Sequence, residues 1–327
     1  MTRAWLAALA LVAAPVLAAP FEELALVSEH PVEGMIGGNL SGLAMCNGRL
    51  WTVSDRDDTL LYSLDTSQKT WTAEPHTMVV PEPVSYLPLN LRSLASLSAV
   101  VRGGSMDFEG VSCDDAGNRY LVSEAHGTVL KVPVTGDPVW LDLPQALVDQ
   151  ARSRGMLQRF NAIFEGIAVN GAGDRIWLAA ERESRGLLVV QREQGKWGCK
   201  KSCVLLADPG QEAPPPQLKG DKLSTKDFSD ISLFNGKLFT LERSVYRICR
   251  RTLETGAVER CWSFAKEALL PERVYDQPYG LTEALVVDEA GAWIGIDNNF
   301  SARADGEKRP IVWRFSAPAD GWGGSAR

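Results

Sequence analysis

The sequence has few histidines and none of the common catalytic signatures. Its only histidines are His30, His76 and His126, and its six cysteines form no Cys-x2-Cys pair, so a zinc–thiolate site is a poor interpretation. No nucleophile elbow, zincin motif, P-loop or dinucleotide-binding fingerprint is present. The groups that remain available for catalysis are carboxylates and a metal cation that carboxylates can bind.

Basic clusters and long apolar runs are also scarce. The formal net charge is −7 and there is no basic block, which argues against a nucleic-acid partner. After residue 20, no apolar run approaches the ~20 residues of a membrane-spanning helix. The N terminus has Arg3, an apolar run to Leu17 and then Ala-Ala-Pro, which is typical of a secretory signal peptide. We therefore expect a signal peptide at residues 1–19, a single domain at 20–327, and a periplasmic or secreted protein.

One pattern recurs along the chain. Each copy has three short apolar or alternating runs separated by turn residues, and most copies allow a fourth run. Helical periodicity is confined to inserts around residues 143–154 and 265–270. Antiparallel strands that repeat at roughly 50–70 residues are typical of a β-propeller. The fold class is therefore all-β, a propeller of five blades by repeat count, with six as the alternative. The last copy lacks a fourth strand, and a strand from Glu23 is expected to pair near residues 311–315 and close the ring.

Acidic residues occupy fixed places in these copies. The first strand of a propeller blade lines the channel and the second runs antiparallel to it, so both sets should meet at one mouth of the channel. The residues that open the first strands are Ser41, Glu109, Glu165, Asp230 and Glu283. The residues that close the second strands are Asp55, Glu124, Glu181, Glu242 and Asp297. Arginines directly follow three of this second set, and they can pair with the acids or bind an anionic ligand: Arg56, Arg182 and Arg243.

The cysteines of an exported chain predict disulfides. Cys249 and Cys261 are placed symmetrically about a Glu-Thr-Gly turn, so we expect them to be bridged across a hairpin. Two further pairs can also bridge, one across a Lys-Lys-Ser tip and one between equivalent places of neighbouring copies: Cys199 with Cys203, and Cys46 with Cys113.

Five segments in order carry a family resemblance. They are "GGNLSGLAMCNGRLWTVSDR", "DFEGVS…YLVSE", "NAIFEGIAV…WLAAERES", "DISLFNGKLFTLERS" and "GIDNNF". Together, from Gly37 to Phe315, they resemble the phytase-like family, labelled "esterase-like activity of phytase". The resemblance implies a secreted propeller with glutamates and aspartates in phosphoester chemistry. The last copy departs from the family pattern, since Ala284 and not glycine follows the glutamate. The matching positions are Glu109, Glu165, Glu181, Glu242, Asp297 and Asn298.

These observations predict a divalent-cation-assisted hydrolase of phosphoesters or other esters at the acidic mouth. Carboxylates converging without cysteine or histidine suit Ca²⁺, or Mg²⁺, better than zinc. The expected cation ligands are Glu109, Glu165, Asp230 and Glu283, and the expected catalytic residues are Glu109, Glu165 and His126. The expected ligand-binding residues are Asp55, Arg56, Glu124, Glu181, Arg182, Glu242, Arg243, Asp297 and Asn298.

Two other functions stay open at this point. One is a non-enzymatic periplasmic propeller that binds a ligand or a protein, and the other is a lactonase-type calcium propeller. The acids that close the second strands can also be explained without chemistry, as turn caps or as arginine partners on a rigid scaffold. In each enzymatic interpretation the partner is a small-molecule ester or phosphoester. The expected oligomeric state is a monomer.

Overall fold

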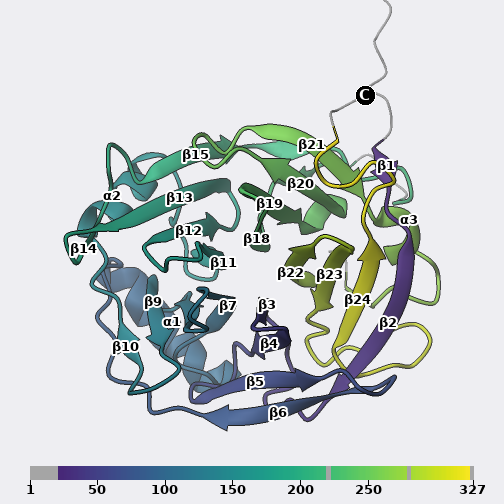
Figure 1. The fold of residues 1–327 in the computed structure, drawn as a ribbon, viewed down its shortest axis with the longest axis horizontal. Helices are drawn as coiled ribbons and strands as arrows, with labels where there is room; N and C mark the ends of the chain where they lie inside the picture. Colours follow the sequence, from purple (N-terminus) through teal and green to yellow (C-terminus); the bar gives the residue numbers. More distant parts are fainter. Residues whose placement is uncertain (1–20, 219–221, 278–280, 325–327) are drawn as a thin grey trace, which may run out of the picture.

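The computed structural model describes residues 21–218, 222–277 and 281–324. The predicted signal peptide at residues 1–19 lies outside them. In the described residues, five antiparallel sheets surround a central axis like the blades of a propeller (Figure 1). The strands of blade 1, from the axis outward, are β3 (Gly42–Cys46), β4 (Arg49–Val53), β5 (Leu60–Asp65) and β6 (Trp71–Thr77). Those of blade 2 are β7 (Phe108–Cys113), β8 (Arg119–Ser123), β9 (Thr128–Val132) and β10 (Val139–Trp140).

The next two blades follow in chain order. Blade 3 contains β11 (Phe164–Val169), β12 (Arg175–Ala180), β13 (Ser184–Glu193) and β15 (Val204–Pro209), with β14 (Lys196–Gly198) paired to the far end of β13. Blade 4 contains β18 (Asp230–Phe234), β19 (Lys237–Glu242), β20 (Arg247–Arg251) and β21 (Val258–Ser263). A short hairpin lies between the two blades in the chain, formed by β16 (Gln211–Glu212) and β17 (Ser224–Thr225).

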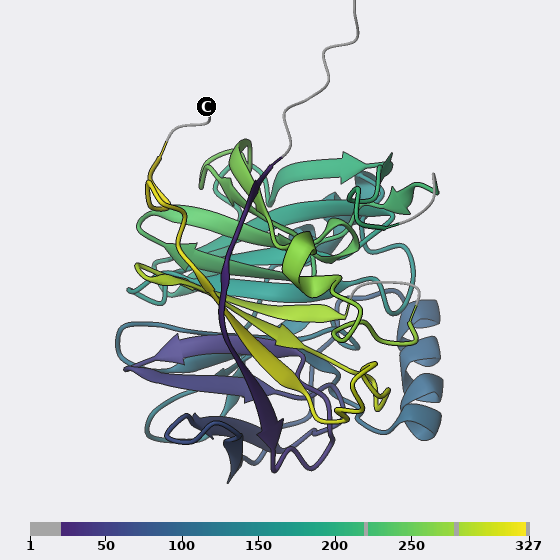
Figure 2. The same cartoon turned by 90° about the vertical axis from the view of Figure 1, so that its right-hand side faces the viewer.

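The N-terminal strand closes the ring, as predicted. Blade 5 has three strands from the C-terminal part of the chain: β22 (Thr282–Asp288), β23 (Gly291–Ile296) and β24 (Ile311–Ser316). Its fourth strand is β2 (Leu26–Glu33), which pairs antiparallel with β24 from Leu26 opposite Phe315 to Pro31 opposite Ile311, and Figure 2 shows the two side by side. The preceding β1 (Glu22–Glu23) pairs in parallel with β21 of blade 4, and the end of β2 pairs in parallel with β6 of blade 1, so the N-terminal segment joins three blades.

Each pair of neighbouring blades encloses its own apolar core. Five clusters of buried side chains lie between blades 1 and 2, 2 and 3, 3 and 4, 4 and 5, and 5 and 1. Trp51, Trp177 and Trp293 of the second strands belong to three of these clusters. Five cores between five sheets confirm the five-bladed count, which follows from the repeat of alternating apolar residues.

Glycines let the inner strands approach one another. A Cβ at Gly42 would lie 2.8 Å from the Cα of Gly110, and one at Gly110 would lie 2.6 Å from the carbonyl oxygen of Glu165. A Cβ at Gly166 would lie 2.7 Å from the Cα of Asp230. These contacts are shorter than any side chain permits, so the glycine of each Phe-Glu-Gly segment is required for packing around the channel.

Helices and disulfides complete the described structure. Helices α2 (Gln145–Ser153) and α3 (Ala265–Ala268) lie where periodicity predicts them, whereas α1 (Leu89–Arg102), between blades 1 and 2 in the chain, is an additional helix. None of the helices described is long and apolar enough to cross a membrane. The expected Cys249–Cys261 disulfide is present with a Cα–Cα distance of 4.1 Å, and both of the other possible pairs, Cys46–Cys113 and Cys199–Cys203, are bridged too, at 5.9 and 4.8 Å.

Candidate functional site

Irregularities in three inner strands mark the places of the predicted glutamates. The pairing register shifts between Phe108 and Gly110, between Phe164 and Gly166, and between Thr282 and Ala284. In each case the residue passed over is the acid of the pattern: Glu109, Glu165 or Glu283. A bulge of this kind inserts an unpaired residue and re-aims its side chain. The three glutamates therefore leave the sheet pattern and line the channel mouth.

The residues that close the second strands lie at the same mouth. The backbone N–H of Glu124 donates to the carbonyl of Asp107 at 2.9 Å, immediately before the inner strand of its own blade. Equivalent bonds join Glu181 to Ile163 at 3.3 Å and Asp297 to Leu281 at 2.9 Å, and the N–H of Asp55 donates to Oγ of Ser41 at 3.1 Å. Three equivalent backbone bonds, and one bond to a serine hydroxyl, thus place four of the acids that close second strands beside the starts of the inner strands.

A cavity of about 800 Å³ occupies this mouth. Among the described residues, three basic side chains line it, Arg182, Lys222 and Arg243, and carboxylates outnumber them. Residues of the hairpin insert between blades 3 and 4, such as Gln211, Pro214 and Thr225, contribute one wall. The seven carboxylates among the described lining residues are Asp55, Glu109, Glu165, Glu181, Asp227, Glu283 and Asp297.

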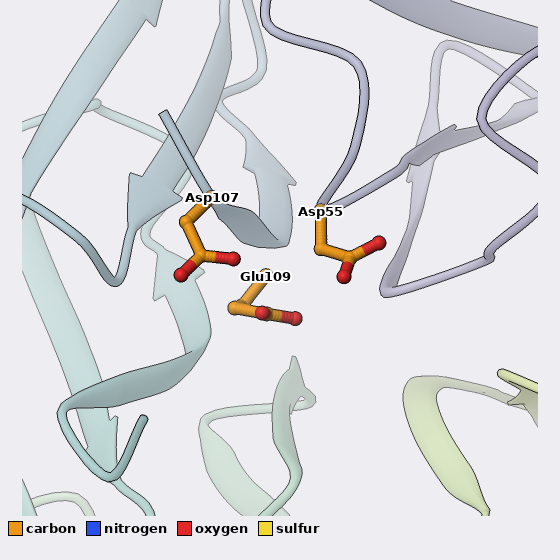
Figure 3. A group of neighbouring side chains, drawn as sticks. All are labelled: Asp55, Asp107 and Glu109. Atoms are coloured by element: carbon orange, nitrogen blue, oxygen red, sulfur yellow. The ribbon is translucent and has the colours of Figure 1, made fainter. Parts of the chain in front are cut away.

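Six acids form two groups with the geometry of a cation site. The first triad is Asp55, Asp107 and Glu109, and the second triad is Glu124, Glu165 and Glu181. In each triad, one oxygen from every carboxylate lies within 4.8 Å of the others. Figure 3 shows the first triad, with Asp55 following β4 and the other two residues at the start of β7, their carboxylates around one space.

Electrostatic repulsion links the two triads. Desolvation in the channel mouth raises the pKa of Glu109 well above its usual value, and the carboxylate of Glu165 raises it further. The pKa of Glu165 is raised in the same way by burial, then by Glu181 and Glu124. Burial and Asp107 also raise the pKa of Glu124. Burial and mutual repulsion therefore favour the protonated forms of these glutamates, and a bound cation would oppose both effects.

Arg243 is the main counter-ion of the opposite wall. It lies in the 3-10 turn η1 (Arg243–Val245); its guanidinium bonds to Glu181 and Glu283, and its Nε donates to Asp227 at 2.9 Å. Arg182 bonds to the same oxygen of Glu181, while the other oxygen, Oε2, is buried without a hydrogen-bond partner among the described residues. Burial raises the pKa of Glu283 to about 7, although Arg243 opposes the rise.

Asp297 and Arg56 complete the mouth on the side of blades 5 and 1. Asp297 accepts a hydrogen bond from the N–H of Asn299 at 2.8 Å. Burial, with a contribution from the nearby Asp55, raises the pKa of Asp297 well above its usual value. The Arg56 guanidinium lies 3.8 Å from Asp55 and 4.9 Å from the ring centre of Phe300, so Arg56 pairs with the acid that precedes it, as expected from the sequence.

Two predicted acids have other partners. Asp230 accepts the N–H of Ile231 and the N–H of Leu285 in the next blade, both at 2.7 Å, and it does not line the cavity. Its carboxylate therefore joins two inner strands and is separate from the cation ligands predicted with it. Glu242 is completely buried and forms ion pairs with Arg185, Arg247 and Arg251. Burial opposes its ionisation, but these arginines hold the pKa of Glu242 below its usual value.

His126 and Asn298 also lie away from the triads. The His126 ring contacts the carbonyl of Ser105 at 3.2 Å and lines a different cavity, beside α1. The Nδ2 group of Asn298 donates to the carbonyls of Ser301 at 3.0 Å and Lys308 at 2.8 Å. His126 is thus not placed to exchange a proton with a ligand among the triads, and Asn298 holds together the loop that follows β23.

Two acids of the mouth are missed by the sequence pattern. Asp107 belongs to the first triad, and Asp227 binds Arg243 and accepts a hydrogen bond from Oγ of Ser244 at 2.9 Å. Both directly precede a phenylalanine just before an inner strand, in Asp107-Phe108 and Asp227-Phe228. This Asp-Phe pair is the signal that identifies them.

Comparison with known proteins gives one family and several propeller-type structures. The Phytase-like family model, described as "Esterase-like activity of phytase", matches residues 36–310. No curated protein matches the chain significantly.

Among solved structures, glutaminyl cyclase from Myxococcus xanthus is similar with a TM-score of 0.48 and 11% identity, over 90% of this chain and 99% of that one. The PQQ-bound aldose sugar dehydrogenase from Streptomyces coelicolor gives a TM-score of 0.44 and 11% identity, over 91% and 98% of the two chains. Likenesses this distant carry no information about activity.

Proposed function

The chain belongs to the phytase-like family, and on this premise we propose that it is a divalent-cation-dependent hydrolase of phosphoesters or other esters. The active site is the acidic cavity at the channel mouth. The protein acts outside the cytoplasm, as a single propeller domain, once residues 1–19 are removed as a signal peptide. The three disulfides support export, because such bonds persist in oxidising compartments.

The observation that carries this proposal is that both acidic triads contribute to one cavity. Asp55 and Glu109 of the first triad line it together with Glu165 and Glu181 of the second. Carboxylates brought this close repel one another and lose hydration, which is unfavourable without a proton, an arginine or a metal ion. A scaffold has no need of this arrangement, whereas a cation site does.

The first triad suits a cation better than the second. In the second triad, Glu124 accepts the N–H of Ile163 at 2.9 Å, and Glu181 binds two arginines. In the first triad, Asp55 accepts a hydrogen bond from Asn39 at 2.9 Å, but Arg56 lies 3.8 Å away, farther than the arginines that bind Glu181. The hard carboxylate oxygens of the first triad suit Ca²⁺ or Mg²⁺. Compared with the ligand set predicted from the sequence, Glu109 is kept and Asp55 and Asp107 join it. Bound there, a divalent cation supplies Lewis acidity toward a phosphoryl or acyl oxygen and toward water.

Residues of the second triad have roles in proton transfer and anion binding. Glu165 is the general base: it lines the cavity, and one of its carboxylate oxygens lies within 4.8 Å of oxygens of Glu124 and Glu181. Because its pKa is raised, Glu165 ionises and accepts a proton only as the pH rises. Arg182, whose side chain is 38% exposed, and the buried Arg243 line the same cavity and can orient an anionic group.

The test combines cation binding with turnover. The melting temperature is measured in EDTA and with added CaCl₂ or MgCl₂, beside a panel of p-nitrophenyl phosphate, p-nitrophenyl acetate and a γ-lactone. We expect calcium or magnesium to stabilise the protein and to support hydrolysis of at least one ester. Glu109→Gln should abolish the stabilisation, and Glu165→Gln should abolish turnover. Glu254→Gln, at an exposed turn residue, is the matched control.

The possible results separate the candidate functions. Equal melting with EDTA and with either cation, together with no turnover, would sink the hydrolase proposal. Turnover of the lactone alone would assign the same carboxylates to a lactonase-type propeller. Cation binding without turnover of any compound would favour a non-enzymatic binding propeller.

A further inference from the structure

A second cavity of about 280 Å³ lies beside the acidic one, between blades 4 and 5. Leu218, Ser224 and Ser244 line both cavities, so the two adjoin. Two consecutive residues of β22 face different cavities, because Thr282 lines the second one and Glu283 the acidic one. A ligand at the acidic mouth can therefore extend into the second cavity.

The second cavity differs chemically from the first. Among the described residues of its lining there is no carboxylate, and the one charged residue there, Arg273, already bonds to Glu267 at 2.8 Å and lies 3.5 Å from Glu29. A few neutral polar side chains line it, and most of the remaining wall is aromatic or aliphatic, including Tyr246, Leu269, Val274, Leu281, Ile296 and Trp313. Such a surface favours an apolar group and disfavours a phosphate.

Two hydroxyl groups of this cavity lack partners. Thr282 is 1% exposed, and neither its Oγ1 nor the buried hydroxyl of Tyr275 has a hydrogen-bond partner among the described residues. Both residues line the second cavity. Buried polar atoms are nearly always paired, and leaving them unpaired is unfavourable. A ligand with an oxygen atom at this depth would pair with them.

We propose that the second cavity is a subsite for an aromatic arm of the substrate, an arm that carries one hydrogen-bonding oxygen. This rests on the proposed function for the position of the scissile ester at the acidic mouth. The volume is close to the lower end of the range for ligand pockets, ~300–1,000 Å³, so it holds one or two rings and not a long lipid chain. The substrate is accordingly an aryl-substituted ester.

Binding is tested first without turnover, with 2-naphthol and naphthalene as probes in equilibrium dialysis against the full-length mature protein. The two probes share a shape, and only 2-naphthol has an oxygen. We expect wild type to prefer 2-naphthol by roughly fivefold or more, the size of one hydrogen bond. Thr282→Val with Tyr275→Phe should bind both probes equally and melt no lower than wild type. Leu269→Trp, a half-buried position of the wall, should bind neither probe.

Turnover then separates this inference from the proposed function. The ratio of kcat/KM for 2-naphthyl acetate to that for ethyl acetate is compared between wild type and Leu269→Trp, so that leaving-group reactivity cancels. The subsite predicts at least a fivefold fall in this ratio in the variant. An unchanged ratio with no 2-naphthol binding overturns the subsite and leaves the hydrolase intact. Binding of 2-naphthol with the predicted preference, but no turnover of any ester, overturns the hydrolase and supports the subsite.

Discussion

Replacing Glu283 by glutamine should stabilise the protein above pH 7 and leave its stability unchanged near pH 4.5. The Glu283 carboxylate is 12% exposed and shares the guanidinium of Arg243 with Glu181 and Asp227. Three carboxylates around the single positive charge of the Arg243 guanidinium leave excess negative charge in a desolvated site. Glutamine keeps the size of the side chain and an oxygen that can accept from Arg243, but it removes one charge.

The magnitude follows from the pKa of Glu283, which rises from 4.5 to about 7 on folding. Since the folded state binds this proton more tightly, the associated stability is fully present below pH 4.5 and is lost as the pH rises through 7. At 1.36 kcal/mol per pH unit, the loss is about 3 kcal/mol. The glutamine variant does not ionise, so at pH 8 it should exceed wild type by up to that amount.

Thermal unfolding followed by circular dichroism measures this difference. Wild type and Glu283→Gln are compared in EDTA from pH 4.5 to 8.5, with Glu254→Gln as the exposed control. A difference of about 3 kcal/mol corresponds to roughly 6 °C for a chain of this size. If Glu283→Gln instead melts below wild type at pH 8, the ionised carboxylate is a favourable partner of Arg243 and the charge-excess argument is wrong.

Three other changes test the structure. Glu242→Gln should lower the free energy of unfolding by about 3 kcal/mol at pH 7, because it leaves three arginines without their buried partner. Since folding lowers the Glu242 pKa, this deficit should shrink as the pH falls below 4.5, and chemical denaturation at several pH values measures it. Gly110→Ala should lower stability by about 1–3 kcal/mol through overpacking against the neighbouring inner strand, whereas Gly198→Ala, with no atom nearby, should melt like wild type. Joint replacement of Cys249 and Cys261 by serine should lower it by about 3 kcal/mol through loop entropy, and a melting temperature equal to wild type would contradict this.

The sequence predicts most of the fold because the propeller is built from one repeated unit. Strand spacing, the turns and the missing outer strand are local features, and they lead directly to five blades closed by the N-terminal strand. Asn47-Gly48 and Asn235-Gly236 adopt positive φ angles of 51°, 78°, 46° and 68° in the turns after β3 and β18, as such pairs do in tight hairpins. Helix α1 is less predictable, because only Leu91 of its large apolar residues is well buried and its apolar pattern is weak.

The site is predicted only in outline because its pairing is not local. That acids gather at one mouth follows from their position in the repeat. Which of them meet depends on contacts between blades, as Arg243 shows: it follows Glu242 in the chain yet binds Glu181 and Glu283. The turn η1 directs Arg243 into the channel, and Glu242 is held by three other arginines. Asp230 likewise appears equivalent to the glutamates, but no bulge displaces it and backbone amides bind its carboxylate.

The Phe-Glu-Gly segments show why fold and site cannot be separated here. In β7 and β11 the phenylalanine is buried between blades, the glutamate is passed over by the strand pairing, and the glycine admits the next inner strand. The glycine brings the backbones together, so the carboxylates before it come within range of repulsion. The Phe-Glu-Gly segments that pack the inner strands around the channel therefore also create the excess negative charge at its mouth. A proton or, as proposed, a cation at the mouth would offset this repulsion in the closed ring.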